Sequence, residues 1–137
     1  TLDFHWGFLV GGFLMMHFVE GMFLAIVFML AHLVHEVDFP EAKVNPLKME
    51  HSWIVHQLYT TANFATRSWI TNLVTGGLNH QIEHHIFPNV CHIHYPKISS
   101  ILKETALKYG YPYYEHHSVL SALKSHVKHL KVMGRAS

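Results

Sequence analysis

Residues 6–34 read WGFLVGGFLMMHFVEGMFLAIVFMLAHLV, a stretch that contains no Lys, Arg or Asp. Its only titratable side chains are His17, Glu20 and His32. A helix that spans a bilayer needs about 20 mostly apolar residues, so this stretch is long enough. As one helix it would measure roughly 45 Å, more than a hydrocarbon core of about 30 Å. We therefore expect a transmembrane helix over residues 6–35, with one end projecting into water.

The basic residues give this helix an orientation. Residues 1–42 contain no Lys or Arg, and all ten basic residues lie from Lys43 onward. Because cytoplasmic flanks of membrane helices carry an excess of Lys and Arg, the downstream region should be cytosolic. Only 14% of the residues are charged, against roughly 25% in soluble domains, which also favours an integral membrane protein. The single cysteine, Cys91, excludes an intrachain disulfide and a Cys-rich zinc site.

The rest of the chain predicts further helices in one domain. Residues 35–50 contain two prolines and mixed charges, which indicates a loop that leaves the membrane. Helices are expected in three later stretches: 51–74 along the bilayer surface and ending at Gly76-Gly77, 98–110 with Gly110 as its C-cap, and 118–133. The predicted fold is all-α, with one long transmembrane helix followed by a cytosolic, membrane-surface helical region over residues 36–137.

Histidine is unusually abundant, with fifteen residues scattered along the chain. Three of them fall in NHQIEHHIFP, residues 79–88. If residues 79–86 are helical, Gln81, His84 and His85 stand at i, i+3 and i+4 and share one face. Consecutive residues point about 100° apart on a helix, so His84 and His85 suit two metal ions a few Å apart. This stretch therefore predicts part of a metal site.

Two or three histidines cannot complete two metal spheres, which typically need about four to six ligands each. His32 and His35 are the nearest further candidates, because they lie at i and i+3 where the spanning helix emerges. His80 stands four residues before His84 and could join the same face. Glu83 is either a carboxylate that orients a ligand histidine or an exposed helix residue. We expect no metal ligand among eight others: His51, His56, His92, His94, His116, His117, His126 and His129.

The stretch QIEHHIFP resembles the third histidine box of membrane fatty acid desaturases, in the Q-x-x-H-H form of front-end (delta-5/delta-6 type) acyl desaturases. Three further stretches are similar to bacterial members of that family: AHLVHEVDFP, HQLYTTANF and HIHYPKI. The resemblance implies a di-iron, O2-dependent enzyme that removes two hydrogens from an acyl chain to make a cis double bond. Its substrate would be an acyl-CoA or an acyl-lipid. By the same resemblance, His32, Gln81, His84 and His85 are iron ligands or near-ligands.

This sequence also departs from the family pattern. Family members carry two earlier boxes, H-x-x-x-H and H-x-x-H-H, and residues 1–31 contain neither. The chain starts at Thr1 without an initiator Met or a signal peptide, so we expect a carboxy-terminal part of a desaturase that is inactive alone. The resemblance implies a ferredoxin or cytochrome-type electron donor, for which the basic tail offers a docking surface. No nucleic-acid partner is expected.

Two other functions fit the same residues. Related membrane di-iron proteins hydroxylate alkanes or sterols, and product analysis would separate them from desaturases. A noncatalytic, membrane-anchored, histidine-rich metal-binding module would instead show variable metal loading and consume no oxygen. The placement of Gln81, His84 and His85 on one helix face argues against that module, because a catalytic site needs converging ligands.

Overall fold

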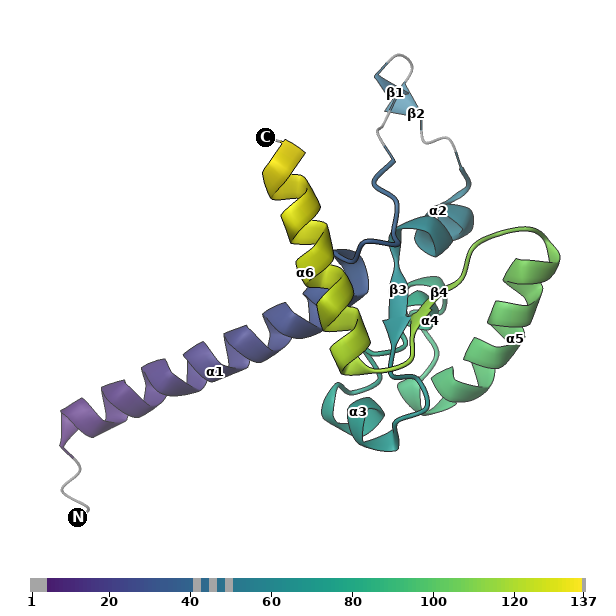
Figure 1. The fold of residues 1–137 in the computed structure, drawn as a ribbon. Helices are drawn as coiled ribbons and strands as arrows, with labels where there is room; N and C mark the ends of the chain where they lie inside the picture. The colour runs from purple at the N-terminus through teal and green to yellow at the C-terminus, as the bar shows by residue number, and fades with distance from the viewer. Residues whose placement is uncertain (1–4, 41–42, 45–46, 49–50, 137) are drawn as a thin grey trace.

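The computed structural model describes residues 5–40, 43–44, 47–48 and 51–136 (Figure 1). Its described helices are α1 (Trp6–His32), α2 (Trp53–Thr60), α3 (Trp69–Val74), α4 (Gln81–Ile86), α5 (Tyr95–Lys108), α6 (Val119–Ala136) and a 3₁₀ turn, η1 (His92–His94). The short strands are β1 (Lys43–Val44), β2 (Leu47–Lys48), β3 (Ala62–Phe64) and β4 (Tyr114–His116). Figure 1 shows α1 extending away from a body that the other elements form around its carboxyl end.

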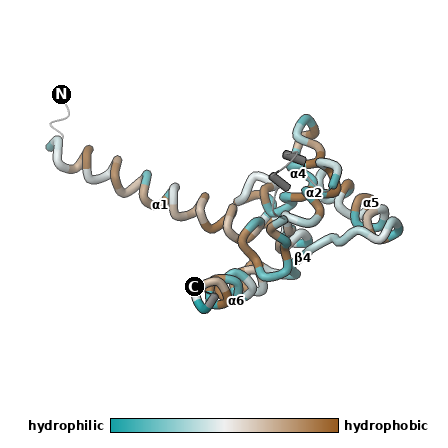
Figure 2. Tube along the Cα trace, turned by 90° about the horizontal axis from the view of Figure 1, so that it is seen from above, coloured by the Kyte–Doolittle hydropathy of each residue, from teal (hydrophilic) through white to brown (hydrophobic). Residues whose placement is uncertain are grey.

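Helix α1 has the length and composition that a membrane crossing requires. It is 27 residues long, and among the described residues it is the one helix long and apolar enough to span a bilayer. Only Val27, Leu30 and Ala31, near its carboxyl end, are buried. Its remaining apolar side chains face outward, as a lipid-facing helix requires and as the core helix of a soluble protein does not. Figure 2 shows this largely apolar segment projecting from the body.

The end of α1 differs from the prediction. The helix stops at His32, three residues before the predicted end, because Leu33 leaves helical geometry with φ −118° and ψ 54°. The Leu33 N–H still donates to the Met29 carbonyl at 2.9 Å, which closes the last turn. Within the helix, His17 Nδ1 lies 3.5 Å from Glu20 Oε2, so these two polar groups of the apolar stretch pair with each other.

The packed core sits at the carboxyl end of α1. One cluster joins the buried end of α1 to β3 and α6, through Val27, Leu30, Ala31, Phe64, Ala65 and Ala122. A second cluster joins α2, α4 and α5, through Leu58, Ile82 and Ala106. The described helices that follow α1 thus gather around one end of the apolar helix, and α4 carries Ile82 of the second cluster while it also contacts β3.

The predicted single helix over residues 51–74 is wrong. The chain forms α2, then the strand β3, then α3, because residues 62–64 pair in parallel with residues 114–116. Thr61 already has the extended geometry of a strand, with φ −135° and ψ 141°. A local helical pattern carries no information about a partner strand about fifty residues away, so the pairing overrides it.

The all-α prediction needs a further correction. The described residues are mostly helical, but they also contain two two-stranded sheets. β1 and β2 form an antiparallel pair inside the predicted loop, whereas β3 and β4 form the parallel pair. The strands are only two or three residues long, too short for a period-two pattern to be read from the sequence.

The last two helices lie close to their predicted positions. α5 begins at Tyr95 rather than 98, because Pro96 fits the first turn of a helix, where no N–H is needed. It ends at Lys108, and Gly110 follows with φ 76° as the expected left-handed residue. At the start of α6, Ser118 and Ser121 each donate a backbone N–H to the other's hydroxyl oxygen at 3.1 Å.

Gly77→Ala should destabilise the fold more than Gly76→Ala. Gly77 has φ 83°, and a Cβ there would lie 2.5 Å from the Cβ of His92. Gly76 has φ 60° but faces open space. We expect a loss of unfolding free energy of about 2–4 kcal/mol at Gly77, from backbone strain plus a steric clash, and about 1–2 kcal/mol at Gly76 from strain alone. Thermal unfolding in detergent measures both, and equal losses would contradict the close approach of His92 to Gly77.

Candidate metal centre

Three polar side chains from two distant segments meet where α1 ends. His32 is the last residue of α1, Gln81 is the first residue of α4, and His85 follows one turn later. His85 Nε2 lies 3.3 Å from His32 Nε2 and 3.3 Å from Gln81 Nε2. Gln81 Nε2 lies 3.4 Å from His32 Nε2. The three terminal atoms therefore form a nearly equilateral triangle.

This triangle has the dimensions of one face of a metal coordination sphere. Imidazole ligands about 2.0–2.1 Å from a metal stand roughly 2.8–3.0 Å from one another in octahedral geometry and roughly 3.3–3.4 Å in tetrahedral geometry. Gln81 Oε1 is buried and has no hydrogen-bond partner. The amide oxygen and nitrogen have the same shape, so a rotation of the amide would turn this oxygen toward the two imidazoles. Two imidazoles and an amide oxygen therefore fit a bound iron.

The electrostatic setting of His85 suits metal binding. Burial, together with the neighbouring His32 and His84 rings, lowers the pKa of His85 to about 4. The imidazole is therefore neutral at physiological pH, which is the form that donates a lone pair to a metal. His85 thus presents a neutral nitrogen atom at the point where it meets His32 Nε2 and the Gln81 amide.

His84 lies beside this triangle and outside it. Its ring centroid is 5.7 Å from that of His85, with an interplanar angle of 65°. Its other aromatic neighbour is Tyr95, at 6.5 Å. The two consecutive histidines diverge as a helix requires, and of the predicted set only Gln81 and His85 converge with His32. In the part of the chain that the structure describes, no three His, Cys, Asp or Glu side chains converge closely enough to hold a metal.

Two further candidates lie away from the triangle. His80 does not share a face with His84, because it precedes the helix with non-helical φ −100° and ψ 58°. Its ring is buried, and its Nδ1 lies 2.7 Å from the Ser99 hydroxyl. His35 is exposed beyond the end of α1, where its backbone N–H donates to Ser125 Oγ at 2.9 Å. The helix turn that the i, i+3 spacing assumed for His32 and His35 is absent.

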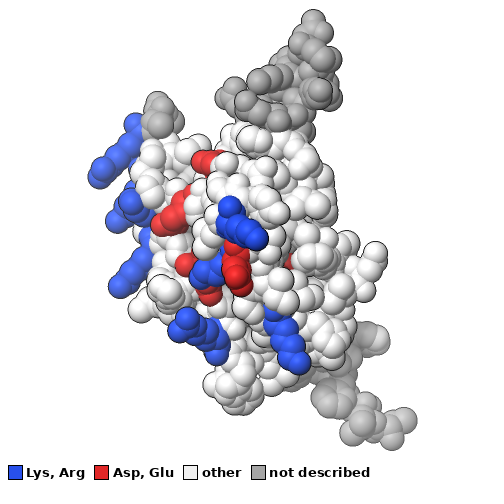
Figure 3. Space-filling view, turned by 90° about the vertical axis from the view of Figure 1, so that its right-hand side faces the viewer, with Lys and Arg blue, Asp and Glu red and all other residues white. Residues whose placement is uncertain are grey.

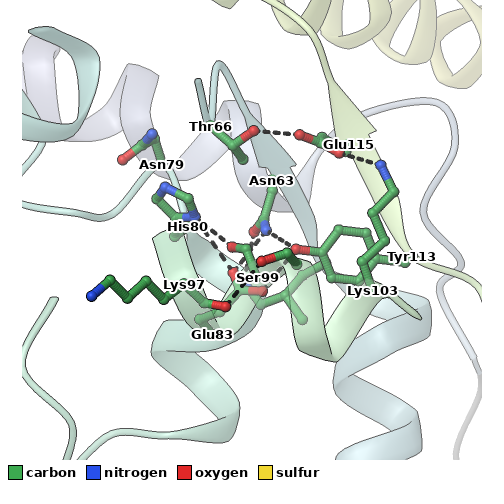
Figure 4. A network of polar contacts seen from close by, with 12 residues as sticks. Asn63, Thr66, Asn79, His80, Glu83, Lys97, Ser99, Lys103, Tyr113 and Glu115 are labelled. Carbon is green, nitrogen blue, oxygen red and sulfur yellow. Dashed lines mark hydrogen bonds and ion pairs between the residues drawn. The ribbon is translucent and has the colours of Figure 1, made fainter. Parts of the chain in front are cut away.

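Glu83 is fully buried, which rules out the exposed alternative. It accepts hydrogen bonds from Asn63 Nδ2 at 2.7 Å and from the Tyr113 hydroxyl at 2.7 Å (Figure 4). Asn63 Oδ1 in turn accepts from the Ile82 N–H at 2.9 Å, and Asn63 Nδ2 also lies 2.8 Å from the Tyr113 oxygen. Glu83 therefore ties α4 to β3 and to the residue before β4. Through these contacts it fixes the helix that carries Gln81 and His85.

Burial affects the ionisation of this network. It raises the pKa of the Glu83 carboxyl and lowers that of the His80 ring, whose Nδ1 lies 3.8 Å from Glu83 Oε2. Both shifts favour the neutral forms. The hydrogen bonds from Tyr113 and Asn63 oppose the shift at Glu83, because they stabilise its charged form. Burial, and then the Glu83 charge, raise the pKa of Tyr113, so the phenol keeps its proton and remains a donor.

The similarity to known proteins covers this entire site. The family model for fatty acid desaturases matches residues 2–117, which include α1 and all the residues of the triangle. The chain belongs to the fatty acid desaturase family.

Individual desaturases show the same relationship. An acyl-lipid (8-3)-desaturase of Physcomitrium patens is 42% identical over 116 residues, which cover 85% of this chain and 24% of the moss protein. The sn-1 linoleoyl-lipid 6-desaturase of Synechocystis sp. is 38% identical, covering 85% and 33%. Delta(5) fatty acid desaturase A of Dictyostelium discoideum is 32% identical, covering 89% and 27%. The chain thus spans about a quarter to a third of these relatives' lengths, and no solved structure matches it.

Asn63 and Tyr113 of this desaturase chain are site-supporting residues that analysis of the sequence did not single out. Asn63 lies in the stretch 51–74, which was predicted to be one helix. Tyr113 follows Pro112, in the segment between the predicted helices 98–110 and 118–133. The available signal was the desaturase-like stretch HQLYTTANF, which contains Asn63. No comparable signal marks Tyr113, because its role depends on the parallel pairing of β3 with β4.

A polar cleft of about 210 Å³ adjoins the network. Lys103 and Glu115 pair across it at 2.6 Å, and Glu115 also accepts from the Thr66 hydroxyl. His80 and Ser99 contribute to the wall that separates this cleft from Glu83. The paired charges therefore line a cleft beside the desaturase chain's buried polar network.

Proposed function

We propose that this chain is the carboxy-terminal part of a di-iron, O2-dependent fatty acid desaturase that introduces a cis double bond into an acyl-CoA or acyl-lipid substrate. The observation that carries the proposal is the triangle of His32, Gln81 and His85 at the end of an apolar helix of membrane-spanning length. Three curated relatives are named as desaturases, and two of those names specify acyl-lipid or linoleoyl-lipid desaturation.

The ligand roles follow from the positions of the side chains. His32 and His85 would hold one iron through their Nε2 atoms, and Gln81 would add its amide oxygen. His84 diverges from His85 and would hold the second iron of a pair. The remaining ligands would come from segments equivalent to the two earlier histidine boxes of the family. When bound, the iron pair supplies the oxidising power toward an unactivated methylene group.

This chain's own residues position the ligands and shield them. α1 brings His32 to the level where the helix leaves the membrane, so an acyl chain held in the bilayer lies close to the site. Glu83, Asn63 and Tyr113 keep α4 against β3, which fixes the direction in which Gln81 and His85 point. A site held this firmly meets the geometric demands of a reaction at one chosen carbon.

We propose an integral membrane location with the region after α1 in the cytosol. The uneven distribution of Lys and Arg supports this orientation, because α1 and the residues before it have none and all ten lie from Lys43 onward. A ferredoxin or cytochrome-type protein would supply electrons from the cytosolic side, in keeping with the family. Nothing in the site calls for nucleic acid.

The test is product analysis of the intact protein that contains this chain. It should be expressed in a host membrane that supplies acyl lipids and an electron donor, and the fatty acids analysed by gas chromatography and mass spectrometry. A new cis double bond together with close to two irons per purified chain supports the proposal. An added hydroxyl group would instead identify a di-iron hydroxylase. Variable metal with unchanged lipids would identify a noncatalytic metal-binding module.

A further inference from the structure

Helix α6 has three distinct faces. Its buried face contains Ala122, Ser125 and His126, which are at most 7% exposed and pack against the end of α1. A second face is apolar and open, through Val119, Leu123, Val127 and Leu130 at 41–52% exposure. A third face is basic, through Lys124, Lys128, Lys131 and Arg135. Residues 118–136 contain no Asp or Glu, so nothing on the helix neutralises the third face.

Contacts with α1 place the apolar face of α6 beside the carboxyl half of the apolar helix. Ala122 packs with Val27 and Ala31, in the last turns of the apolar helix. The side chain of Val119 lines an apolar cleft that also contains Phe23 and Ile26 of α1. Val119 belongs to the open apolar face, so this face is directed toward the part of α1 that would lie in the bilayer.

Helix α3 exposes apolar side chains at the same level. Ile70 and Val74 line the same cleft as Val119, and both are more than half exposed. Trp69 and Leu73 extend the exposed area, at 73% and 72%. Large contiguous apolar surfaces are uncommon on soluble proteins and mark an interaction site. α3 and α6 together therefore form one exposed apolar surface at the carboxyl end of α1. We call this surface the apolar shelf.

The direction of α6 agrees with this placement. Figure 1 shows α6 crossing the carboxyl end of α1 rather than running along it, and Figure 2 views α6 nearly end-on while α1 extends across the picture. A helix that lies across a spanning helix can lie in the plane of the membrane. Figure 3 shows basic side chains along the left-hand edge, the side on which α6 lies.

We propose that the shelf formed by α3 and α6 lies in the interface of the cytosolic leaflet, with Lys124, Lys128 and Lys131 bound to anionic lipid headgroups. The inference rests on the membrane location proposed above and adds a lipid-binding surface to it. An amphipathic helix with an apolar stripe beside a lysine stripe is the form that binds such interfaces. Lys side chains reach headgroups by extending their apolar stems along the surface, where an anionic leaflet attracts the charged ends.

Charge favours lipid over a protein partner as the occupant of this shelf. The cytosolic leaflet is the anionic one, and α6 presents only cations beside its apolar stripe. The apolar stripe is continuous, through Val119 and the cleft, with the surface of α1. An acidic electron-donor protein docked here would also pair with the lysines. It would not account for the apolar surface that runs from Val119 to the spanning helix α1.

The test measures which quencher reaches fluorescent labels on the intact protein in vesicles. Cys91, the single cysteine of this chain, and any cysteine elsewhere in the intact protein are replaced by serine, and bimane is attached at Val127→Cys, Lys128→Cys or Phe18→Cys in separate samples. Vesicles contain phosphatidylcholine with or without phosphatidylglycerol. We expect brominated acyl chains to quench the label at 127 severalfold more than aqueous iodide does, and the reverse order at 128. Replacing Lys124, Lys128 and Lys131 by glutamine should abolish the gain in lipid quenching at 127 that phosphatidylglycerol provides.

The label at Phe18 separates the two proposals. If iodide quenches it, α1 does not span the membrane and the proposed location fails. If it is protected while iodide reaches the label at 127, the location stands and the lipid shelf is wrong. Protection of the 127 label from both quenchers would assign the surface to a protein partner or a second copy. Equal lipid quenching at 127 with and without phosphatidylglycerol would overturn the role of anionic headgroups.

Discussion

Replacing His85 by alanine is expected to lower bound iron in the intact protein by at least about tenfold and to abolish desaturation. His85 makes two of the three contacts of the triangle, at 3.3 Å to both His32 and Gln81, so its loss leaves the other two ligands without a shared partner. Losses of this size are typical even for groups that only support a metal ligand. Elemental analysis of the purified protein measures the iron, and fatty acid analysis measures the activity.

The matched control for this change is His117→Ala. His117 is exposed, lies just beyond β4 and touches none of the triangle. Its removal should leave both iron and product unchanged. His126 would be a poor control despite its predicted lack of a ligand role, because its buried Nδ1 lies 2.6 Å from the Leu33 carbonyl oxygen. Full iron content in the His85→Ala protein would show that the triangle is not the metal site.

Asn63→Ala is expected to lower the free energy of unfolding by about 2–4 kcal/mol. The amide of Asn63 donates to Glu83 and accepts from the N–H of Ile82, and both of these groups are buried. Alanine would remove one of the donors to the buried Glu83 carboxyl, which keeps its bond from Tyr113, and would leave the buried N–H of Ile82 unsatisfied, a larger loss than that of the hydrogen bonds alone. Because α4 would lose its attachment to β3, iron content should fall as well.

Thermal unfolding in detergent and elemental analysis together measure this effect. Asn89→Ala is the control, because Asn89 is an exposed residue in the loop after α4. Glu83→Gln should be milder than Asn63→Ala, since the amide keeps the size of the carboxylate and can still accept from Tyr113. An Asn63→Ala protein as stable as the Asn89→Ala protein would mean that the network does not hold α4.

The sequence predicted those parts of the fold that depend on local composition. An apolar stretch without Lys or Arg predicted α1, and the amphipathic patterns near the end predicted α5 and α6, each to within a few residues. It missed β3 because a strand of three residues is specified by its partner, residues 114–116, and not by its own pattern. The same distant pairing explains why one predicted helix over residues 51–74 became two helices and a strand.

The candidate site was predicted in the same uneven way. Helical spacing correctly separated His84 from His85 and, with the family resemblance, drew attention to Gln81 and His32. The spacing argument failed for His80 and His35, because each lies just outside the helix to which it was assigned. The family resemblance included Asn63 only as part of a similar stretch. Its contact with Glu83 depends on how β3 packs against α4, which no local pattern reveals.

The contacts between α6 and the end of α1 also set the order of events when the protein is made. The Ser125 hydroxyl accepts from the N–H of His35, 90 positions earlier in the chain. At a synthesis rate of about 5–20 residues per second, this bond must wait roughly 5–20 s after His35 leaves the ribosome. During that interval the apolar helix can already enter the membrane, but the end that carries His32 is not yet packed against α6. Iron loading of this part of the enzyme is therefore expected to be a late event, which follows translation of α6.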